Sequence, residues 1–261
     1  MQRIHFHKFH GAGNDFILLS HTASSEAPDE ETIRNMCRRH FGVGADGLII
    51  LQASSVADFE MKYYNADGRE GSMCGNGGRC AALYAYEQGM CSEEMSFMAF
   101  DGLHRAKIIN SGDKPLVTLQ MSNVTRIHNG GDHFFIDTGS PHYVAFKQNI
   151  ETIDMDKEAR PLRHHYRKGG TNVNFIEKKG AHYHIRTFER GVEQETLACG
   201  TGITAAAIAV AETHSPGTST IPVKAKGGTL EVSLTKSGGS YENIWLKGPA
   251  VNVFEGTIKF I

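Results

Sequence analysis

Cys74–Ala82 reads CGNGGRCAA, and Cys199–Ala207 reads CGTGITAAA. Each stretch begins with a cysteine followed by glycine, and each runs into small or apolar residues. Glu70 and Glu195 stand at the same distance before the two cysteines, so the match extends upstream of both stretches. A pattern that recurs at this spacing predicts that the chain contains two copies of one structural half.

Each half has the same predicted order of elements: short β-rich runs, the glycine-rich loop with its cysteine, and then a helix. The two helices, at residues 81–86 and 204–211, are apolar on nearly every face, which is typical of a helix enclosed by a sheet. We therefore expect an α/β (α+β) fold of two pseudo-symmetric domains, each a curled mixed β-sheet around a central α-helix.

A polar, glycine-rich stretch at Asn123–Gly131 indicates the domain boundary. Residues 1–124 then form the N-terminal half with Cys74, and residues 125–249 form the C-terminal half with Cys199.

Local signals mark the ends of the helices. Gly89 fits the position after the end of the first helix, and Ser215–Gly217, with its central proline, ends the second. A third helix, Glu30–Arg39, is acidic first and basic last, as the helix dipole favours. The strand candidates, many of them alternating between apolar and polar residues, are Gly47–Gln52, Phe59–Tyr64, Leu116–Met121, His133–Asp137, His182–Phe188, Thr229–Leu234 and Asn243–Leu246.

Composition narrows the classes of function. The 261 residues are 40% hydrophobic and carry a formal net charge of -2, which provides no bulk attraction to nucleic acid or to an anionic membrane. We expect a small-molecule ligand and no nucleic-acid or membrane partner. No stretch approaches the roughly 18 apolar residues of a membrane span, and no signal peptide is recognised, so a cytoplasmic location is expected. Because the 5 cysteines are few and odd in number, reduced thiols are expected.

A cysteine at the start of a helix suggests proton chemistry. The unpaired N–H groups of the first turn and the helix dipole favour the thiolate over the thiol. The same N–H groups, made accessible by the glycines after Cys74 and Cys199, form a good seat for a carboxylate.

If the halves pack about a pseudo-twofold axis, one carboxylate can sit between the two helix starts, with one sulfur on each side of its α-carbon. Stereoinversion needs this arrangement, because a proton leaves one face of the carbon and returns on the other. We expect no cofactor, since the helix N–H groups take the place of an electron sink such as pyridoxal phosphate. One sulfur must start each turnover as thiolate and the other as thiol.

The halves differ where a substrate side chain would be recognised. Asn65 in the first half corresponds to Arg190 in the second, which follows Glu189. Arginine suits a carboxylate and glutamate suits an ammonium group, so the sequence suggests a substrate with a charged far end.

Two other classes of function stay open from the residues alone. Cys74 and Cys199 could form a regulatory disulfide in a redox protein, and the helix starts could bind an amino acid without catalysis. Cys37, Cys80 and Cys91 are expected to be structural, because single buried thiols usually pack as small hydrophobes.

The sequence predicts no catalytic or binding role for several other features. No metal site is expected, because no Cys-x-x-Cys occurs. Gly42–Gly47 matches the dinucleotide-binding pattern by letter, but it follows a predicted helix and precedes a strand, the reverse of the required order. His5 and His7 are expected on a solvated strand face, and His142 either orients a neighbour or is structural.

In these residues and in several longer motifs, the chain resembles the diaminopimelate epimerases, which interconvert LL- and meso-diaminopimelate in lysine and peptidoglycan biosynthesis. The resemblance covers nearly the whole chain and rests on these motifs: Gly11–Phe16 (GAGNDF), Gly42–Gly47 (GVGADG), Tyr64–Gly68 (YNADG), Met73–Arg79 (MCGNGGR), Asn172–Phe175 (NVNF), Glu189–Val192 (ERGV) and Ala198–Gly202 (ACGTG). It implies the fold stated above, a homodimer, and a C-terminal strand at about residues 250–261 that returns to the first domain.

The resemblance also implies roles for single residues. Cys74 and Cys199 would be the acid–base pair of a cofactor-independent epimerase. The reacting carboxylate would be held by Gly75, Asn76, Gly200 and Thr201, and the far end of the substrate by Asn14, Asn65, Asn172, Glu189 and Arg190. Two positions depart from the family pattern: Ser140 stands where many members have asparagine, and Gly47 where some have glutamine. Proline racemases share the architecture but are not expected to carry the Glu189-Arg190 pair.

Overall fold

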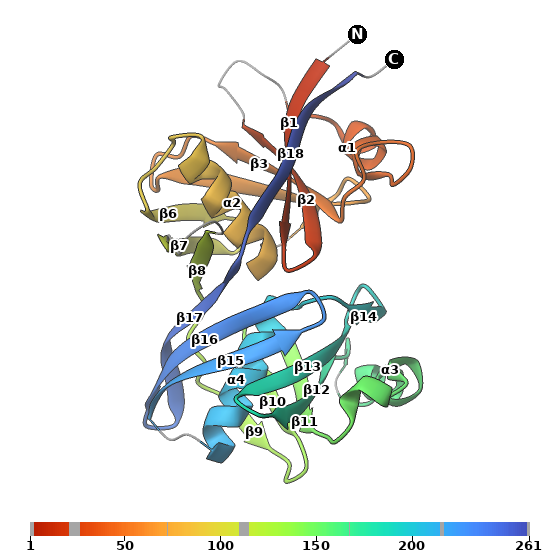
Figure 1. Cartoon of the computed structure of the whole chain (residues 1–261), viewed down its shortest axis with the longest axis vertical. Helices are drawn as coiled ribbons and strands as arrows, with labels where there is room; N and C mark the ends of the chain where they lie inside the picture. The colour runs from red at the N-terminus through yellow and green to blue at the C-terminus, as the bar shows by residue number, and fades with distance from the viewer. Residues whose placement is uncertain are drawn as a thin grey trace. The chain divides into compact units, whose positions relative to one another are not determined.

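The computed structural model describes residues 3–20, 27–71, 73–109, 115–166, 168–214 and 217–259. It divides into two compact units, Met1–Leu119 with Pro249–Ile261, and Gln120–Gly248. Each unit is a mixed β-sheet with few helices (Figure 1), which confirms the expected fold class.

The first unit is built on one mixed sheet. Its strands are β1 (Arg3–Gly11), β2 (Asn14–Ser20), β3 (Gly47–Gln52), β4 (Phe59–Asn65), β5 (Glu70–Gly71), β6 (Glu94–Ala99), β7 (Gly102–Ile109), β8 (Leu116–Gln120) and β18 (Val251–Lys259). The pairing order is β18-β1-β2-β3-β4-β6-β7-β8, with β5 also on β4. The β2–β3 and β4–β6 pairs are parallel and the others are antiparallel.

The second unit repeats this topology strand for strand. Its strands are β9 (Ile127–Asn129), β10 (Phe134–Asp137), β11 (Pro141–Phe146), β12 (Asn172–Lys179), β13 (His182–Glu189), β14 (Gln194–Thr196), β15 (Thr218–Ala225), β16 (Gly228–Ser237) and β17 (Ser240–Pro249). The order is β9-β10-β11-β12-β13-β15-β16-β17, with β14 on β13. Here β11–β12 and β13–β15 are the parallel pairs, at the positions equivalent to those in the first unit.

Each sheet has one end strand that comes, in chain order, directly after the strands of the other sheet. β9 follows the strands of the first unit but pairs with β10 in the second, whereas β18 follows the strands of the second unit but pairs with β1 in the first. The chain returns to the first unit at Pro249, and the units divide between Leu119 and Gln120, a few residues before the boundary expected near residue 124.

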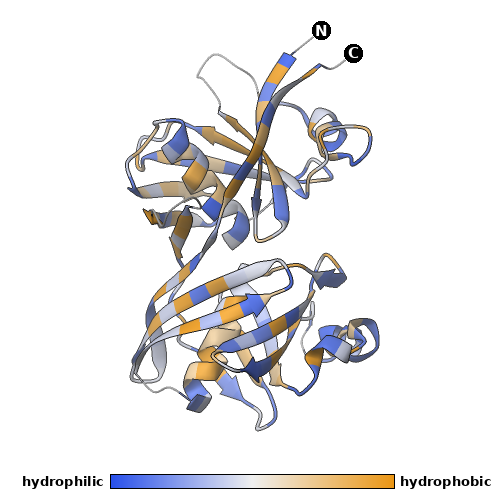
Figure 2. Cartoon of the chain, viewed as in Figure 1, coloured by the Kyte–Doolittle hydropathy of each residue, from blue (hydrophilic) through white to orange (hydrophobic). Residues whose placement is uncertain are grey.

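A helix of small residues packs within each sheet. α2 (Gly75–Glu87) contacts β1, β2, β3, β4 and β7, and α4 (Gly200–His214) contacts β10, β11, β12, β13, β15 and β16. Every residue from Gly75 to Ala85 is buried, as is every residue from Gly202 to Ala211. Figure 2 shows α4 as apolar along most of its length. Small side chains allow the surrounding strands to approach the helix closely, so the prediction of central helices is confirmed.

The first helix ends as its glycine predicts. Gly89 has φ +68°, and its N–H donates to Tyr86 O at 3.0 Å while the N–H of Met90 donates to Ala85 O at 2.9 Å. These two bonds form a Schellman motif, in which a glycine adopts the left-handed conformation without strain. α4 ends at His214, and the proline expected to stop it lies outside the described residues.

The remaining helices occupy equivalent places in the two units. α1 (Glu30–Cys37) is capped by Asp29, which accepts a hydrogen bond from Thr32 N at 2.8 Å. α3 (Met155–His165) is capped by Asp154, and a short 3-10 helix, η1 (Ile150–Thr152), precedes it. The strand candidates were all confirmed with small shifts at their ends, whereas α3 was not predicted because Pro161 lies inside it.

The expectation that His7 lies on a solvated face is wrong. His5 is exposed, but His7 is only 7% exposed, and its ring packs against Tyr84 of α2 with centroids 4.9 Å apart. The cause is that α2 covers this face of β1 at His7. No helix within the described ranges is long and apolar enough to cross a membrane.

Candidate active site

Cys74 is the N-cap residue of α2. Its backbone is extended (φ -108°, ψ 149°), its Sγ accepts a hydrogen bond from Gly77 N at 3.3 Å, and its carbonyl accepts one from Gly78 N at 2.8 Å. The sulfur therefore takes the place that a serine or aspartate oxygen takes in ordinary caps. A thiolate is favoured at this position, because it faces the positive end of the helix dipole.

Two asparagines lie beside this sulfur. Asn14 Oδ1 is 3.9 Å from Cys74 Sγ and accepts a hydrogen bond from Asn76 Nδ2 at 3.3 Å. The fold of the first unit thus brings Asn14, from one predicted motif, next to Cys74 and Asn76 from another.

A charged cluster outside the predicted set holds Asn14. Asp46 Oδ2 accepts from Asn14 Nδ2 at 2.6 Å, and Arg39 bridges Asp46 and Asp15 at 2.8 and 2.6 Å. Lys8, which is 8% exposed, adds a 2.7 Å ion pair to Asp15. Burial of Asp15 opposes its ionisation, but the hydrogen bonds from Arg39 and Lys8 outweigh this and lower its pKa to about 2.

Arg79 is a fully buried cation one turn into α2. Its guanidinium donates to Gly75 O at 3.1 Å, to Asn76 Oδ1 at 2.8 Å and to Pro249 O at 3.4 Å. Burial lowers its pKa to about 10, which still leaves it protonated at neutral pH. Among the described residues no carboxylate pairs with Arg79, so its charge adds to the positive potential at the start of α2.

The start of α4 repeats several of these contacts, with a neutral residue where α2 has Arg79. Cys199 is 7% exposed, its Sγ lies 3.4 Å from Thr201 Oγ1, and its carbonyl accepts from Ile203 N at 2.9 Å. Thr204, which aligns with Arg79, donates to Gly200 O at 2.9 Å just as Arg79 donates to Gly75 O. The two helix starts therefore share the bond to the cysteine carbonyl and the bond to the carbonyl of the first glycine, but differ in charge at the aligned positions 79 and 204.

His142 lies under the start of α4 as a neutral structural residue. It is fully buried, and its Nδ1 lies 3.0 Å from Asn174 Nδ2. Burial lowers the pKa of His142 to about 3, so the ring is uncharged at neutral pH. Gly202 packs on this pair: a Cβ there would lie 2.5 Å from Asn174 Oδ1 and 3.3 Å from His142 Cε1. Of the two roles considered for His142, support of the helix start fits this packing.

Three of the five residues predicted to bind the far end of the substrate, Asn172, Glu189 and Arg190, lie in the same unit as Cys199, whereas Asn14 and Asn65 lie in the first unit. Asn172 is buried, its Oδ1 accepts from the backbone N–H of Arg190 at 2.8 Å, and its Nδ2 donates to Ser140 Oγ at 2.9 Å. Glu189 Oε2 accepts from Thr196 Oγ1 at 2.9 Å. Ser140, one of the departures from the family pattern, is thus a partner of a predicted site residue.

Asn65, the fifth residue predicted for the far end, lies at the end of a strand of the first unit. It ends β4, its backbone N–H donates to Arg69 O at 2.9 Å, and it lies opposite Gly47 in the β3–β4 ladder. The other departure, Gly47, has a packing cause: a Cβ at this position would lie 2.5 Å from the Tyr63 ring and 2.6 Å from Tyr64 O.

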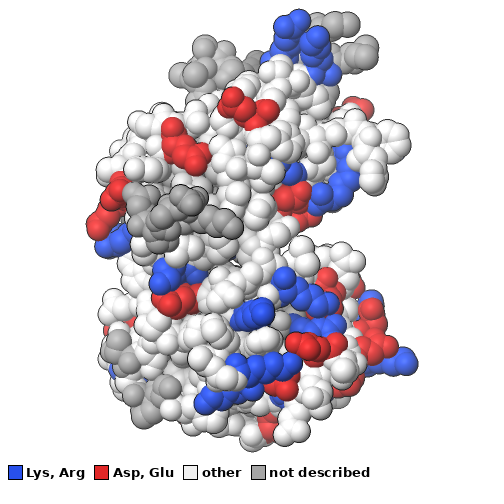
Figure 3. All heavy atoms as spheres, in the orientation of Figure 1, with Lys and Arg blue, Asp and Glu red and all other residues white. Residues whose placement is uncertain are grey.

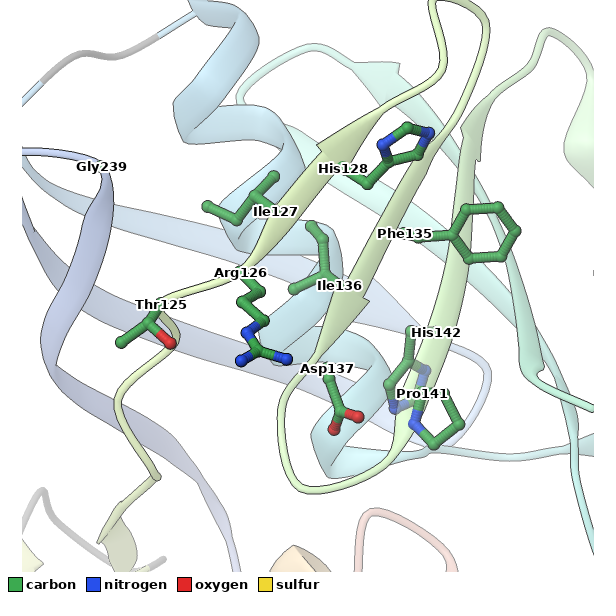
Figure 4. A pocket seen from close by; sticks show the side chains of 10 residues that line it. All are labelled: Thr125, Arg126, Ile127, His128, Phe135, Ile136, Asp137, Pro141, His142 and Gly239. Atoms are coloured by element: carbon green, nitrogen blue, oxygen red, sulfur yellow. The ribbon is translucent and has the colours of Figure 1, made fainter. Parts of the chain in front are cut away.

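A separate cavity of about 430 Å³ lies in the second unit (Figure 4). Asp137 at the end of β10, His142 on β11 and Arg126 just before β9 are among its lining residues. None of the predicted site residues lines this cavity, so it does not contribute to the assignment. On the face in Figure 3, positive and negative side chains are interspersed, in keeping with the net charge of -2.

Comparison with known proteins gives a consistent family assignment. The chain matches the family model for diaminopimelate epimerase over residues 6–127 and 134–253. It is 43% identical to the diaminopimelate epimerase of Flavobacterium psychrophilum over 257 residues, which cover 97% of this chain and 99% of that protein. It is 41% identical to that of Chlorobaculum tepidum over 256 residues, or 95% and 98% of the two chains. The chain belongs to the diaminopimelate epimerase family.

Solved structures at lower identity share the fold of this epimerase family member. A phenazine biosynthesis protein of the PhzF family from Bacillus anthracis superposes with a TM-score of 0.77 at 16% identity, over 100% of both chains. A probable proline racemase from Agrobacterium radiobacter gives 0.69 at 14% identity, over 99% of this chain and 93% of that one. The family resemblance found in the sequence is therefore confirmed, and membership places the chain among the isomerases.

The cluster that holds Asn14 predicts a loss of stability in acid. Because the pKa of Asp15 is lowered in the folded state, its contribution, on the order of 1 kcal/mol after allowance for solvent screening, is present above about pH 4 and is lost as pH falls toward 2. Urea unfolding at pH 7 and below pH 4 should show Asp15→Asn less stable than wild type at pH 7, with the difference narrowing in acid. The exposed Asp156→Asn on α3 is the control, and an Asp15 difference independent of pH would contradict the assignment.

Proposed function

We propose that this chain interconverts LL- and meso-diaminopimelate without a cofactor, with Cys74 and Cys199 exchanging the proton at the α-carbon. The observation that carries the proposal is the matched setting of the two sulfurs, each at the start of a buried helix in one of two units with the same topology. A cysteine kept for packing alone would not need this setting twice.

In the proposed reaction, a thiolate removes the α-proton from one face and becomes a thiol. The C–H electron pair stays on the α-carbon as a carbanion, whose charge is shared with the carboxylate. The second thiol then donates its proton to the opposite face and becomes the thiolate. The product has the inverted configuration, and the two sulfurs have exchanged protonation states, so they titrate as a pair.

The reacting carboxylate is proposed to bind at the two helix starts, through Gly75, Asn76, Gly200 and Thr201. The first N–H groups of a helix have no partner within the helix, and they are aimed at an anion placed on the axis. Donors that are already in position stabilise the negative charge that builds up in the transition state, which is the largest single contribution in many enzymes.

The far end of diaminopimelate carries a second carboxylate and a second ammonium group. We assign the carboxylate to Arg190 and the ammonium to Glu189, with Asn14, Asn65 and Asn172 as further hydrogen-bonding groups. The 2.8 Å bond from Arg190 N to Asn172 Oδ1 supports this, because it fixes the backbone from which the arginine side chain extends.

The wider setting follows the family resemblance. We propose that the enzyme acts in the cytoplasm, in the supply of lysine and peptidoglycan precursors, and that it is a homodimer of chains whose two compact units are the duplicated domains. Light scattering of the eluted chain tests the dimer, since a monomer of 28.6 kDa at working concentration would contradict it.

The two-thiol mechanism predicts the effect of removing either sulfur. Cys74→Ala and Cys199→Ala should each lower the epimerisation rate by roughly 10²–10⁴-fold, because each removes one acid–base group. Cys91→Ala, at a partly exposed thiol outside both helices, should retain the wild-type rate.

The measurement is incubation with LL-diaminopimelate in deuterated buffer with reductant, following both configuration and label. Retention of most of the rate in either single variant would refute the mechanism. Wild-type chain that binds the amino acid without introducing solvent deuterium would instead be a binding protein, and activity that requires an oxidant would favour the redox alternative.

The charge difference between the helix starts predicts different resting states for the two sulfurs. The buried Arg79 cation interacts electrostatically with Cys80 and, less strongly, with Cys74, whereas the position equivalent to Arg79 near Cys199 is the neutral Thr204. We therefore propose that Cys74 is the thiolate in the free enzyme. In the pH profile of kcat/KM, the midpoint of the acidic limb should lie roughly one pH unit higher in Arg79→Met than in the wild type.

Two variants serve as controls for this prediction. Arg79→Lys keeps the charge and should leave the limb in place, and Thr204→Val removes the equivalent hydrogen bond without changing charge. A limb that moves equally in Arg79→Met and Thr204→Val would show that packing, not charge, is responsible.

The distal assignment predicts substrate-dependent losses at Arg190. Arg190→Ala removes a charge-assisted hydrogen bond to the distal carboxylate, so kcat/KM for diaminopimelate should fall at least about tenfold. The slow reaction of a monocarboxylic amino acid should change little. Equal losses for both substrates would argue against this role for Arg190.

A further inference from the structure

His5, His7 and Glu255 converge at one end of the β1–β18 pair. His7 lies directly opposite Glu255 in the antiparallel ladder, and His5, two residues earlier on β1, projects from the same face. The imidazole centroids of His5 and His7 are 5.2 Å apart.

The distances between the potential ligand atoms are too long for hydrogen bonds but close to those between the ligands of a metal ion. The Nε2 atoms of His5 and His7 lie 3.7 and 3.6 Å from the same carboxylate oxygen of Glu255, and one atom from each residue falls within 4.8 Å of the other two. A tetrahedral site with bonds of 2.0–2.1 Å has edges of about 3.3 Å. A shift of a few tenths of an ångström would bring the nitrogen–oxygen distances to this value.

The surroundings of His7 favour the form of imidazole that binds metals. Its burial lowers its pKa, although Glu255 and Glu87 oppose this effect, so the ring tends to be neutral. Its Nδ1 is enclosed and has no hydrogen-bond partner among the described residues. Packing against Tyr84 fixes the ring of His7. It does not explain why this buried imidazole directs its Nε2 toward the carboxylate of Glu255.

The donor set indicates the class of ion. Two imidazoles and one carboxylate suit Zn²⁺ and its neighbours in the first transition series, whereas Mg²⁺ and Ca²⁺ prefer oxygen ligands alone. The side chains of His5 and Glu255 are 58% and 64% exposed, which leaves a path for the ion and room for water as a fourth ligand.

We propose that His5, His7 and Glu255 bind one divalent transition-metal ion of the Zn²⁺ type. The bound ion would join β1 to β18, the first and last strands of the chain. The site is separate from the proposed chemistry: Tyr84, which packs on His7, is ten residues along α2 from Cys74, a separation of roughly 15 Å. The proposal therefore stands or falls independently of the epimerase mechanism.

The test is metal binding by the whole chain, free of any polyhistidine tag and kept reduced. Titration with Co²⁺ reports the ligand type by its absorption, since thiolate ligands give an intense near-ultraviolet band that imidazole and carboxylate ligands lack. We expect one ion bound without that band, and Zn²⁺ should raise the melting temperature in a concentration-dependent way. His5→Ala and Glu255→Gln, both at exposed side chains, should each weaken binding at least about tenfold.

His182→Ala, which removes an exposed histidine of β13 in the other unit, is the matched control and should bind as the wild type does. Because neither His5 nor Glu255 is buried, both test variants are expected to fold. Unchanged affinity in both variants, no binding by the wild type, or metal held only through thiolates would each overturn the proposal.

Discussion

The structure depends on how the first turn of a buried helix satisfies its N–H groups. Most residues in the first turns of α2 and α4 are buried, and a buried N–H donor without a partner in the helix needs an acceptor elsewhere in the protein or on a ligand. At α2 the sulfur of Cys74 is one such acceptor. The same requirement that makes a thiolate stable also makes a bound carboxylate stable, so the proposed base and the proposed substrate seat have one physical origin.

The elements that could be predicted are those set by local chemistry. These signals act within a few residues, so the sequence shows them directly. They are Gly89 at the end of α2, the acidic start of α1, and the small apolar residues of α4. α3 escaped prediction because Pro161 is tolerated at an exposed turn of a helix held by its cap and its packing. The burial of His7 escaped prediction as well, since the helix that covers it is about seventy residues away in the chain.

The same limit applies to the site. The residues that fix the site lie in the same motifs, but the sequence does not show which partner each one contacts. Asp46 holds Asn14, Asn174 holds His142, and Arg79 bonds Asn76 through contacts that only the fold brings about. Duplication explains why the two helix starts share their geometry. Their difference at Arg79 and Thr204 is the basis on which the two sulfurs are proposed to hold unequal charge, as a thiol–thiolate pair would require before its first turnover.

The position of β18 has a consequence for synthesis on the ribosome. Most two-domain chains can complete their first domain while the second is still being made. Here the edge of β1 stays unpaired until residues 251–259 leave the exit tunnel, so the earlier-made unit waits for a segment translated after the second unit. Until then β1 presents free N–H and C=O groups to any other nascent chain, and premature termination near the C-terminus would leave an open β-edge in the part of the protein made first.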